Sequence, residues 1–393
     1  MRTYERTHAF LTFRVDLRDA PADLWIMLGE CQSKCEHVAG VPLRPATAQQ
    51  LYQLFLAKGV LATTAIEGNT LSEEEVLQHL EGKLRLPPSR QYLSQEIDNI
   101  VNGCNTILES VTSGHLLPPS IDSIRQLNKI VLQGLALDEG VVPGEIRRHD
   151  VLVGRYRGAP PEDCEYLLQR LCEWLGSEEF APAKGLEICY AILKAVIAHL
   201  YLAWVHPFGD GNGRTARLLE FQILISAGVP AVSAHLLSNH YNLTRSEYYR
   251  QLDQASKTES GTVSFVSYAA QGLRDGLRQQ IETVREQQWD IAWQNYVHEF
   301  FRDKHSESEV RRRRLVLDLS NMSEPVPLGE IPRISPRMAE AYAKRTQKTL
   351  VRDLNALVQA RLIAETPEGY RALRELILAF LPPRASTEGT RDV

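Results

Sequence analysis

Most of the groups that could carry out chemistry in this chain lie within one stretch of twelve residues, HPFGDGNGRTAR. Its three glycines precede a helical pattern, so backbone N–H groups can converge where the helix dipole adds positive potential, an arrangement that binds phosphate. Asp210 supplies the hard oxygen ligand that Mg²⁺ takes together with phosphate oxygens. His206 can accept or donate a proton near neutral pH and could deprotonate a hydroxyl. The stretch therefore predicts a phosphate-binding loop with a general base at its entry.

The other polar residues of this stretch fit the same chemistry. Arg214 and Arg217 are three residues apart on the first turn of the next helix, so they share one face and could clamp anionic oxygens. Asn212 can donate to a phosphate oxygen, whereas Phe208 is expected to anchor the loop in the core. Each residue alone would be ordinary, but packing hardly explains the combination. The chain has no G-x-x-x-x-G-K-[ST] loop after a strand, which excludes an ordinary P-loop enzyme.

Helices must position this loop, because helical patterns dominate the chain. Apolar residues at three- and four-residue intervals predict helices over 46–66, 91–111, 120–135, 162–176, 186–204, 214–227, 245–256 and 262–303. Ser72 followed by Glu75 forms a capping box, which predicts a further helix from residue 73. The apolar run 188–205 contains Lys194 and His199, so we interpret it as a buried helix and not as a membrane span. The segment 144–161 differs, and its β-branched run with flanking glycines predicts a small hairpin or flap.

Four parts are expected along the chain: an N-terminal helical region over 1–115, a core over 116–305 that holds the twelve-residue loop, a compact segment over 306–380, and a disordered tail over 381–393. The boundary near 303–310 is charged and poor in apolar residues. Within 311–373, twelve Lys and Arg against seven Asp and Glu give a charge of +5.

The compact segment resembles a winged helix-turn-helix, with helices near 311–320, 328–331, 335–343 and 345–362 and a wing around Pro367 and Gly369. Its recognition helix would expose four DNA-contact candidates, Arg345, Gln347, Lys348 and Arg352. The alternative is a small helical interaction or dimerisation domain with a solvated basic face.

The composition is ordinary for a globular protein, with 44% hydrophobic and 24% charged residues. A net charge of −5 argues against general nucleic-acid binding by the whole chain, although the basic segment is an exception. The N-terminal residues lack the apolar core and cleavage site of a signal peptide. The six cysteines are scattered without paired metal spacing. These features predict a cytoplasmic protein with no membrane segment.

The twelve-residue stretch resembles the signature of the Fic domain family, H-P-F-x-[DE]-G-N-G-R-x-x-R, at each fixed position. The resemblance covers roughly 46–280 and includes the flap-like segment and SEYYRQL (246–252). Fic proteins with an N-terminal helical region and a C-terminal winged helix are similar over nearly the whole chain. The resemblance implies a mainly α fold, a helical bundle with a small β-hairpin flap. It also implies transfer of AMP from ATP to a Ser, Thr or Tyr hydroxyl of a target protein and of the enzyme itself, with Mg²⁺.

Roles follow from the resemblance position by position. His206 would be the general base, Asp210 would hold Mg²⁺, and Arg217 would grip the γ-phosphate. Tyr249 would line the adenine pocket, although Ser256 stands where related enzymes often have Asn. The other ATP-binding candidates are Gly211, Asn212, Gly213, Arg214, Thr215 and Ala216 in the loop and helix, and Val153, Gly154, Arg155 and Tyr156 in the flap, which would also pair with the protein substrate. Some relatives carry Lys where Gly213 stands and act as kinases.

An acid stands in an unexpected place in TTAIEGN, residues 63–69. Gly68 and Asn69 indicate the end of a helix, where the carbonyls disfavour a negative charge such as that of Glu67. The Fic family has an inhibitory helix with the pattern [ST]-x-x-x-E-[GN], which Thr63, Glu67 and Gly68 match. The resemblance thus implies that 46–68 is an inhibitory helix whose Glu67 occupies the γ-phosphate position beside Arg217. The same carboxylate could position a water for removal of AMP.

Two alternatives stay open. A Fic enzyme could transfer another nucleotide or a different phosphate-containing group. Alternatively, the chain could be a DNA-binding regulator in which the Fic domain senses nucleotide. The family also makes a homodimer plausible.

Overall fold

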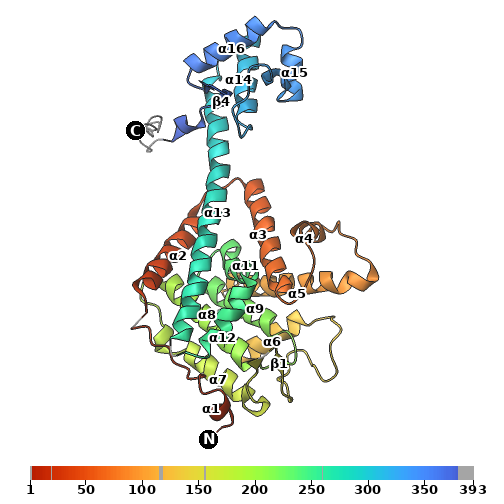
Figure 1. The fold of residues 1–393 in the computed structure, drawn as a ribbon, viewed down its shortest axis with the longest axis vertical. Helices are drawn as coiled ribbons and strands as arrows, with labels where there is room; N and C mark the ends of the chain where they lie inside the picture. Colours follow the sequence, from red (N-terminus) through yellow and green to blue (C-terminus); the bar gives the residue numbers. More distant parts are fainter. Residues whose placement is uncertain (1, 19, 115–117, 155, 259, 379–393) are drawn as a thin grey trace, which may run out of the picture. The chain divides into compact units, whose positions relative to one another are not determined.

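The computed structural model describes residues 2–18, 20–114, 118–154, 156–258 and 260–378, which are mainly helical, as expected (Figure 1). The chain divides into two compact units, Met1–Glu282 and Thr283–Val393. The helices of the first unit are α1 (Tyr4–Thr7), α2 (Ala22–Gly40), α3 (Pro45–Ala65), α4 (Glu73–Leu80), α5 (Gln91–Thr112), α6 (Ile121–Val131), α7 (Cys164–Leu175), α8 (Glu187–Val205), α9 (Asn212–Ser226), α10 (Ala231–Ala234), α11 (Leu236–Leu243), α12 (Arg245–Ala255) and the first part of α13 (Gly261–Phe300).

Helix α8 is the centre of the first unit. It packs against α9, α7 and α2, and most of its residues are buried. Because it is covered on several sides, its apolar residues are spread around the helix and do not form one stripe. Among the described residues it is the one helix long and apolar enough to cross a membrane, but 78% of that stretch is buried inside the fold. The adjoining α9 is equally enclosed, so the loop between them has a rigid support on both sides.

The segment between α3 and α4 follows the predicted turn chemistry. Helix α3 ends at Ala65, and Gly68 adopts a left-handed φ of +104°, a conformation that glycine accepts without steric cost. Ser72 accepts a hydrogen bond from the Glu75 amide, and the Glu75 carboxylate accepts one from the Ser72 amide. The predicted capping box and helix start at residue 73 are therefore confirmed.

Two short strands, β1 (Leu152–Val153) and β2 (Tyr156–Arg157), pair antiparallel within the segment that follows α6. Leu152 is 72% exposed and Val153 is 45% exposed, so this hairpin presents apolar side chains to its surroundings. Arg155, one of the ATP-binding candidates, lies outside the described residues.

The second unit begins within α13, because Trp293, Val297 and Phe301 belong to its core and not to that of the first unit. The charged segment 303–310, where the sequence indicates a boundary, follows the end of this helix. The remaining elements are α14 (Glu307–Leu319), α15 (Pro336–Tyr342), α16 (Gln347–Gln359) and a hairpin of β3 (Ile363–Thr366) with β4 (Gly369–Ala372). Inside this unit, buried Asp353 accepts hydrogen bonds from Arg311 (2.7 Å) and Arg312 (2.9 Å).

Candidate active site

His206 ends helix α8 in the left-handed conformation, with φ of 49° and ψ of 57°. A side chain with a Cβ rarely adopts this conformation, and such residues gather at functional sites. Its Nδ1 lies 3.3 Å from the carbonyl oxygen of Ala203, which assigns the proton to Nδ1 and leaves Nε2 as the acceptor. Burial lowers the pKa of His206 to about 4. The imidazole is therefore neutral at physiological pH, the state that a general base requires.

Asn212 gives the loop after His206 its shape. Its Oδ1 accepts from the Phe208 amide at 2.9 Å, and its Nδ2 donates to the Phe208 carbonyl at 2.8 Å. The side chain is buried, and Phe208 is also buried and bridged to Ile146, so it anchors the loop in the core as expected. Asn212 was expected to donate to a phosphate oxygen, but the structure shows its amide engaged inside the loop.

Position 211 of the loop requires a residue without a side chain, which is glycine. Gly211 has a φ of +75°, and a Cβ would lie 3.0 Å from Leu132 and 3.1 Å from Val131. Next to it, buried Asn128 of α6 donates to the Asp210 carbonyl at 3.0 Å and accepts from the Gly144 amide at 2.9 Å. Asn128 could not be predicted as part of the site, because nothing near it in the chain marks it as a contact of the loop.

Arg147 supports the loop from the opposite direction. Its guanidinium donates to the carbonyl oxygens of His206 (2.7 Å), His149 (2.6 Å) and Ala159 (2.5 Å), and the side chain is buried. Its own amide donates to the Pro207 carbonyl at 2.9 Å. The buried side chain of Arg147 thereby fixes the backbone at the predicted base, His206, and at both ends of the segment that contains β1 and β2. Arg147 is a second residue that sequence reasoning missed.

Both predicted phosphate clamps are buried on the first turns of α9, and each has an acidic partner. Arg214 Nη1 donates to Glu96 Oε1 at 3.0 Å, and its Nη2 lies 3.2 Å from Asp210 Oδ1. Arg217 Nη2 donates to Glu67 Oε1 at 2.5 Å and to the Thr63 carbonyl at 2.9 Å.

The same carboxylate of Glu67 lies against Gly213, where a Cβ would come within 2.2 Å of Oε1. Burial alone would raise the pKa of Glu67, but the charge of Arg217 and the hydrogen bond from it outweigh burial, so the pKa lies below its ordinary value. Glu67 is therefore ionised at neutral pH and covers the first turn of α9, where the sequence predicts phosphate.

Helix α12 contributes residues that contact the end of α3. The Tyr249 hydroxyl lies 3.4 Å from the Ile66 carbonyl and donates to it, and Arg245 donates to the Ala65 carbonyl. Tyr249 is 46% exposed, whereas its neighbour Tyr248 is buried with its hydroxyl 2.8 Å from His199 Nε2. Only Tyr249 of this pair is thus accessible to a ligand.

The other predicted ATP-binding residues differ in what they can offer. Thr215 and Ala216 are fully buried, and the Thr215 hydroxyl donates to the Gly211 carbonyl, so neither side chain can reach a ligand. Val153 is exposed on the hairpin, and Gly154 adopts a φ of +61°. The Tyr156 hydroxyl donates to the Trp204 carbonyl at 2.6 Å, so this side chain connects the hairpin to the end of α8.

Asp210 is the residue that fits a Mg²⁺ ion. Its side chain is half exposed beside the loop. Among the described residues, no group of three or more His, Cys, Asp or Glu could hold a metal ion. One accessible carboxylate next to the predicted phosphate-binding loop is the donor set of an ion that takes its other ligands from phosphate and water.

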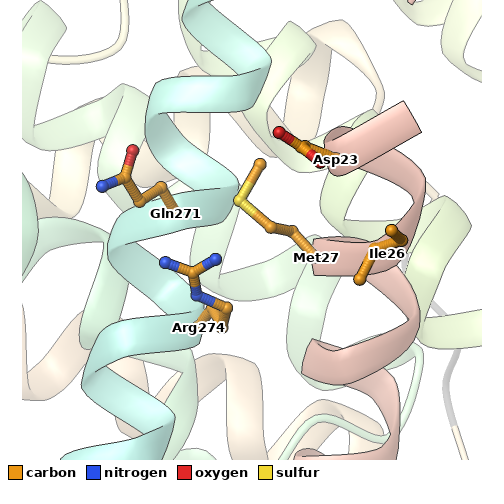
Figure 2. A pocket seen from close by; sticks show the side chains of 5 residues that line it. All are labelled: Asp23, Ile26, Met27, Gln271 and Arg274. Atoms are coloured by element: carbon orange, nitrogen blue, oxygen red, sulfur yellow. The ribbon is translucent and has the colours of Figure 1, made fainter. Parts of the chain in front are cut away.

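A surface hollow between α2 and α13, shown in Figure 2, is lined by Asp23, Ile26, Met27, Gln271 and Arg274. None of these residues belongs to the loop, the hairpin or the end of α3. The hollow is therefore separate from the site built around His206.

Comparison with known proteins agrees with this geometry. Residues 118–224 match the family model Fic/DOC family. The chain is 32% identical over 226 residues to protein adenylyltransferase fic-1 of Caenorhabditis elegans, covering 58% of this chain and 41% of that protein. It is 29% identical over 230 residues to protein adenylyltransferase Fic of Nematostella vectensis, covering 58% and 50%. The chain thus matches half or less of the length of these curated relatives.

Solved structures show the same fold. A Fic family protein from Desulfovibrio desulfuricans G20 superimposes with a TM-score of 0.56 at 20% identity, covering 91% of this chain and 97% of that one. Fic-1 (aa134–508) from C. elegans superimposes with a TM-score of 0.54 at 27% identity, covering 68% and 74%. The mainly helical, Fic-type fold expected from the sequence is confirmed. The part of the chain that matches the Fic/DOC family model, residues 118–224, contains the loop from His206 to Arg217 and the helices that support it.

Proposed function

We propose that this chain is a protein adenylyltransferase, which transfers AMP from ATP to a Ser, Thr or Tyr hydroxyl of a target protein and of itself. The observation that carries this proposal is the meeting of four groups at the N-terminus of α9: the neutral imidazole of His206, the exposed carboxylate of Asp210 and the guanidinium groups of Arg214 and Arg217. The names of the adenylyltransferase relatives support the same reaction.

The reaction requires positioning and charge neutralisation more than covalent catalysis. His206 Nε2 would take the proton of the incoming hydroxyl while its oxygen forms a bond to the α-phosphorus. The bond from that phosphorus to the bridging oxygen breaks, and pyrophosphate leaves. Asp210 would hold Mg²⁺, which supplies positive charge to the phosphate oxygens when it is bound.

The arginines have the donor capacity that this proposal needs. Within the described residues, the buried Nε atoms of Arg214 and Arg217 have no hydrogen-bond partner, so each guanidinium can donate further bonds. The backbone N–H groups of Gly211 to Arg214 lie at the start of α9, where the helix dipole favours anions. Asn212 would act by shaping this loop.

We propose further that Glu67 inhibits the enzyme. Its carboxylate is paired with Arg217 and lies against Gly213, so the γ-phosphate of ATP and Glu67 compete for one place and one cation. Bound ATP must therefore displace Glu67 to adopt its productive position. The exposed strand β1 would receive the target protein by strand addition, since Leu152 and Val153 offer apolar side chains on a hairpin that, within the described residues, pairs with no third strand.

For the second unit, we propose a winged helix-turn-helix that contacts DNA. Helices α14 to α16 precede the β3–β4 hairpin, and the isolated strand pair Val326 with Tyr370 extends that hairpin as in a wing. Arg345, Gln347, Lys348 and Arg352 are all exposed at or near the start of α16. Arg345 is 3.2 Å from Glu307, so its charge is partly neutralised.

A labelling experiment tests the proposed reaction. The protein is incubated with Mg²⁺ and ATP labelled at the α-phosphate, in parallel with a His206→Ala variant and with ATP labelled at the γ-phosphate. We expect label on the protein or on lysate proteins from the α-labelled ATP, its loss in His206→Ala, and none from γ-labelled ATP. Label from another nucleotide alone would favour a different transferred group. No labelling under any condition, together with salt-sensitive binding to a defined DNA, would favour a DNA-binding regulator.

A further inference from the structure

Glu96 is an acidic residue on α5 that neither the sequence motif nor the proposed reaction uses. Its Oε1 accepts from Arg214 Nη1 at 3.0 Å, and its Oε2 accepts from Asn69 Nδ2 at 2.8 Å. The side chain is only 15% exposed. One carboxylate thereby contacts a predicted phosphate clamp through one oxygen and the turn after Glu67 through the other.

Asn69 binds this turn firmly to α5. Besides Glu96, its Nδ2 donates to the Leu93 carbonyl at 2.9 Å, and its Oδ1 accepts from the Leu71 amide at 3.1 Å. Asn69 is buried, so a movement of the turn away from α5 would break its hydrogen bonds to Leu93 and Glu96. Glu96 is therefore connected through Asn69 to the turn that carries Glu67, although the two acids do not touch a common atom.

We propose that Glu96 is a positioning residue with two tasks: it orients Arg214 for the phosphates, and through Asn69 it fastens the inhibitory turn that carries Glu67. This proposal rests on the function proposed above. It makes Glu96 a residue that determines how strongly ATP competes with Glu67 for Arg217.

The two acids differ in how they are held, and this difference gives them different roles. Glu96 lies in the first third of a 22-residue helix, flanked by Leu93 and Ile97, both of which are in the hydrophobic core. Glu67 lies in a turn beyond the end of α3, and its side chain is 35% exposed. A ligand can displace Glu67 without unfolding a helix, whereas Glu96 stays with Arg214. Arg214 thus remains oriented while Arg217 exchanges its partner.

A carboxylate is needed for both tasks at once. Arg214 and Asn69 each present an N–H donor, so both oxygens of residue 96 must accept. Glutamine offers one acceptor and one donor group, so one of the two contacts would become a donor facing a donor. Glu96→Gln is therefore a nearly isosteric change that breaks one contact or the other. Asn69→Ala removes the contact to the turn, together with the bonds of Asn69 to Leu93 and Leu71, and leaves the contact to Arg214.

The test measures ATP binding and backbone hydrogen exchange in the full chain, with and without Glu67→Gly. In the presence of Glu67, Asn69→Ala should speed amide exchange over 64–71 and tighten ATP binding, by about tenfold for the loss of a charge-assisted hydrogen bond. In the Glu67→Gly background, Asn69→Ala should leave ATP binding unchanged. Glu96→Gln should speed the same exchange and should weaken ATP binding in that background, since Arg214 is then misoriented.

Glu109→Gln is the matched control, because Glu109 is an exposed acid further along the same helix. It should behave as the unmodified chain does. The proposal is overturned if Glu96→Gln matches Glu109→Gln in both measurements, or if Asn69→Ala leaves the exchange over 64–71 unchanged. If these binding effects are seen but no AMP is transferred, the role of Glu96 stands and the proposed adenylyltransferase activity is wrong. If AMP is transferred but Glu96→Gln has no effect on exchange or ATP binding, the activity stands and the role of Glu96 is wrong.

Discussion

The carboxylate of Glu67 lies where a side chain on Gly213 would begin, with Oε1 2.2 Å from the position of a Cβ. Glycine at 213 therefore allows an acid from a distant helix end to rest on the first turn of α9. The same open space would admit a phosphate. The negative charge that is unfavourable at the end of α3 is stabilised by Arg217 and by the start of a second helix.

Glu67→Gly should raise AMP transfer and self-labelling by about tenfold or more, because ATP no longer competes with a partly buried ion pair, and 1.4 kcal/mol corresponds to roughly one factor of ten. The variant should also melt earlier without nucleotide, since Arg217 loses a charged partner, and should recover on addition of ATP. Label incorporation and thermal melting measure the two effects. Glu74→Gln, an exposed acid at the start of α4, is the control.

An unchanged rate together with unchanged ATP affinity would rule out inhibition by Glu67. The same variant also decides the second role that the sequence suggests for this acid. If Glu67 positions a water for AMP removal, previously labelled protein should lose its label only when Glu67 is present.

The pH dependence of catalysis should reflect the lowered pKa of His206. Only the neutral imidazole can accept a proton, and burial lowers its pKa from the ordinary value near 6.5 to about 4. In the Glu67→Gly variant, kcat/KM should therefore stay level from neutral pH down to about pH 5 and fall near pH 4. Removal of Glu67 strengthens this expectation, because its negative charge raises the pKa of His206. A fall centred near pH 6.5, in protein whose circular dichroism shows it folded, would contradict it.

Arg147→Lys should slow AMP transfer while leaving ATP affinity nearly unchanged. Lysine cannot reach several carbonyl oxygens at once, so the backbone at His206 loses its support, whereas the predicted phosphate clamps on α9 keep theirs. Without these buried hydrogen bonds, the free energy of unfolding should also fall by about 3 kcal/mol. Chemical denaturation and steady-state kinetics measure the two quantities.

The neighbouring Arg148→Lys is a suitable control, because Arg148 is exposed. Equal behaviour of the two variants would show that the buried guanidinium does not position the base. A rise in the KM for ATP without loss of kcat would show that Arg147 supports nucleotide binding and not the position of His206.

Lys348→Gln and Arg352→Gln should each weaken DNA binding by the second unit. Each should also reduce the salt dependence of binding by about 0.9 for every DNA phosphate that the variant no longer neutralises. Both side chains are exposed on α16. Titrations of a labelled duplex at several salt concentrations give the slope, with Arg314→Gln on α14 as a control. Identical slopes in all variants would favour the alternative of a protein-interaction domain.

Local signals predicted local features of this fold. The capping box at Ser72 and Glu75 marks the start of α4, and Gly68 marks the end of α3, because both depend on residues within one turn of each other. Helix α2 is absent from the predicted ranges, since Cys31 and Cys35 contribute to its buried face and weaken an apparent apolar pattern. The two compact units divide within α13, where a continuous helix carries no break in its sequence pattern between one core and the next.

In the candidate site, too, the sequence predicted the features that depend on residues close together in the chain and missed those that depend on distant ones. The residues of one twelve-residue stretch indicate their chemistry through their spacing, and one acid could be connected to them through a family pattern. Asn128, Arg147 and Glu96 come from three separate segments, and each acts by hydrogen bonds to groups far away in the chain. A single sequence contains no signal for such contacts, since polar residues at those positions would suit a solvent-facing surface equally well.

The hydrogen bonds of Arg147 have a consequence for protein engineering. Its guanidinium binds main-chain oxygens at positions 149, 159 and 206, so these bonds depend on the path of the backbone and not on the identity of any side chain. Exchange of the exposed Leu152 and Val153 is therefore expected to leave these hydrogen bonds, and with them the backbone of His206, in place. The hairpin is a natural place to vary residues in a library that seeks new targets for an unchanged catalytic centre.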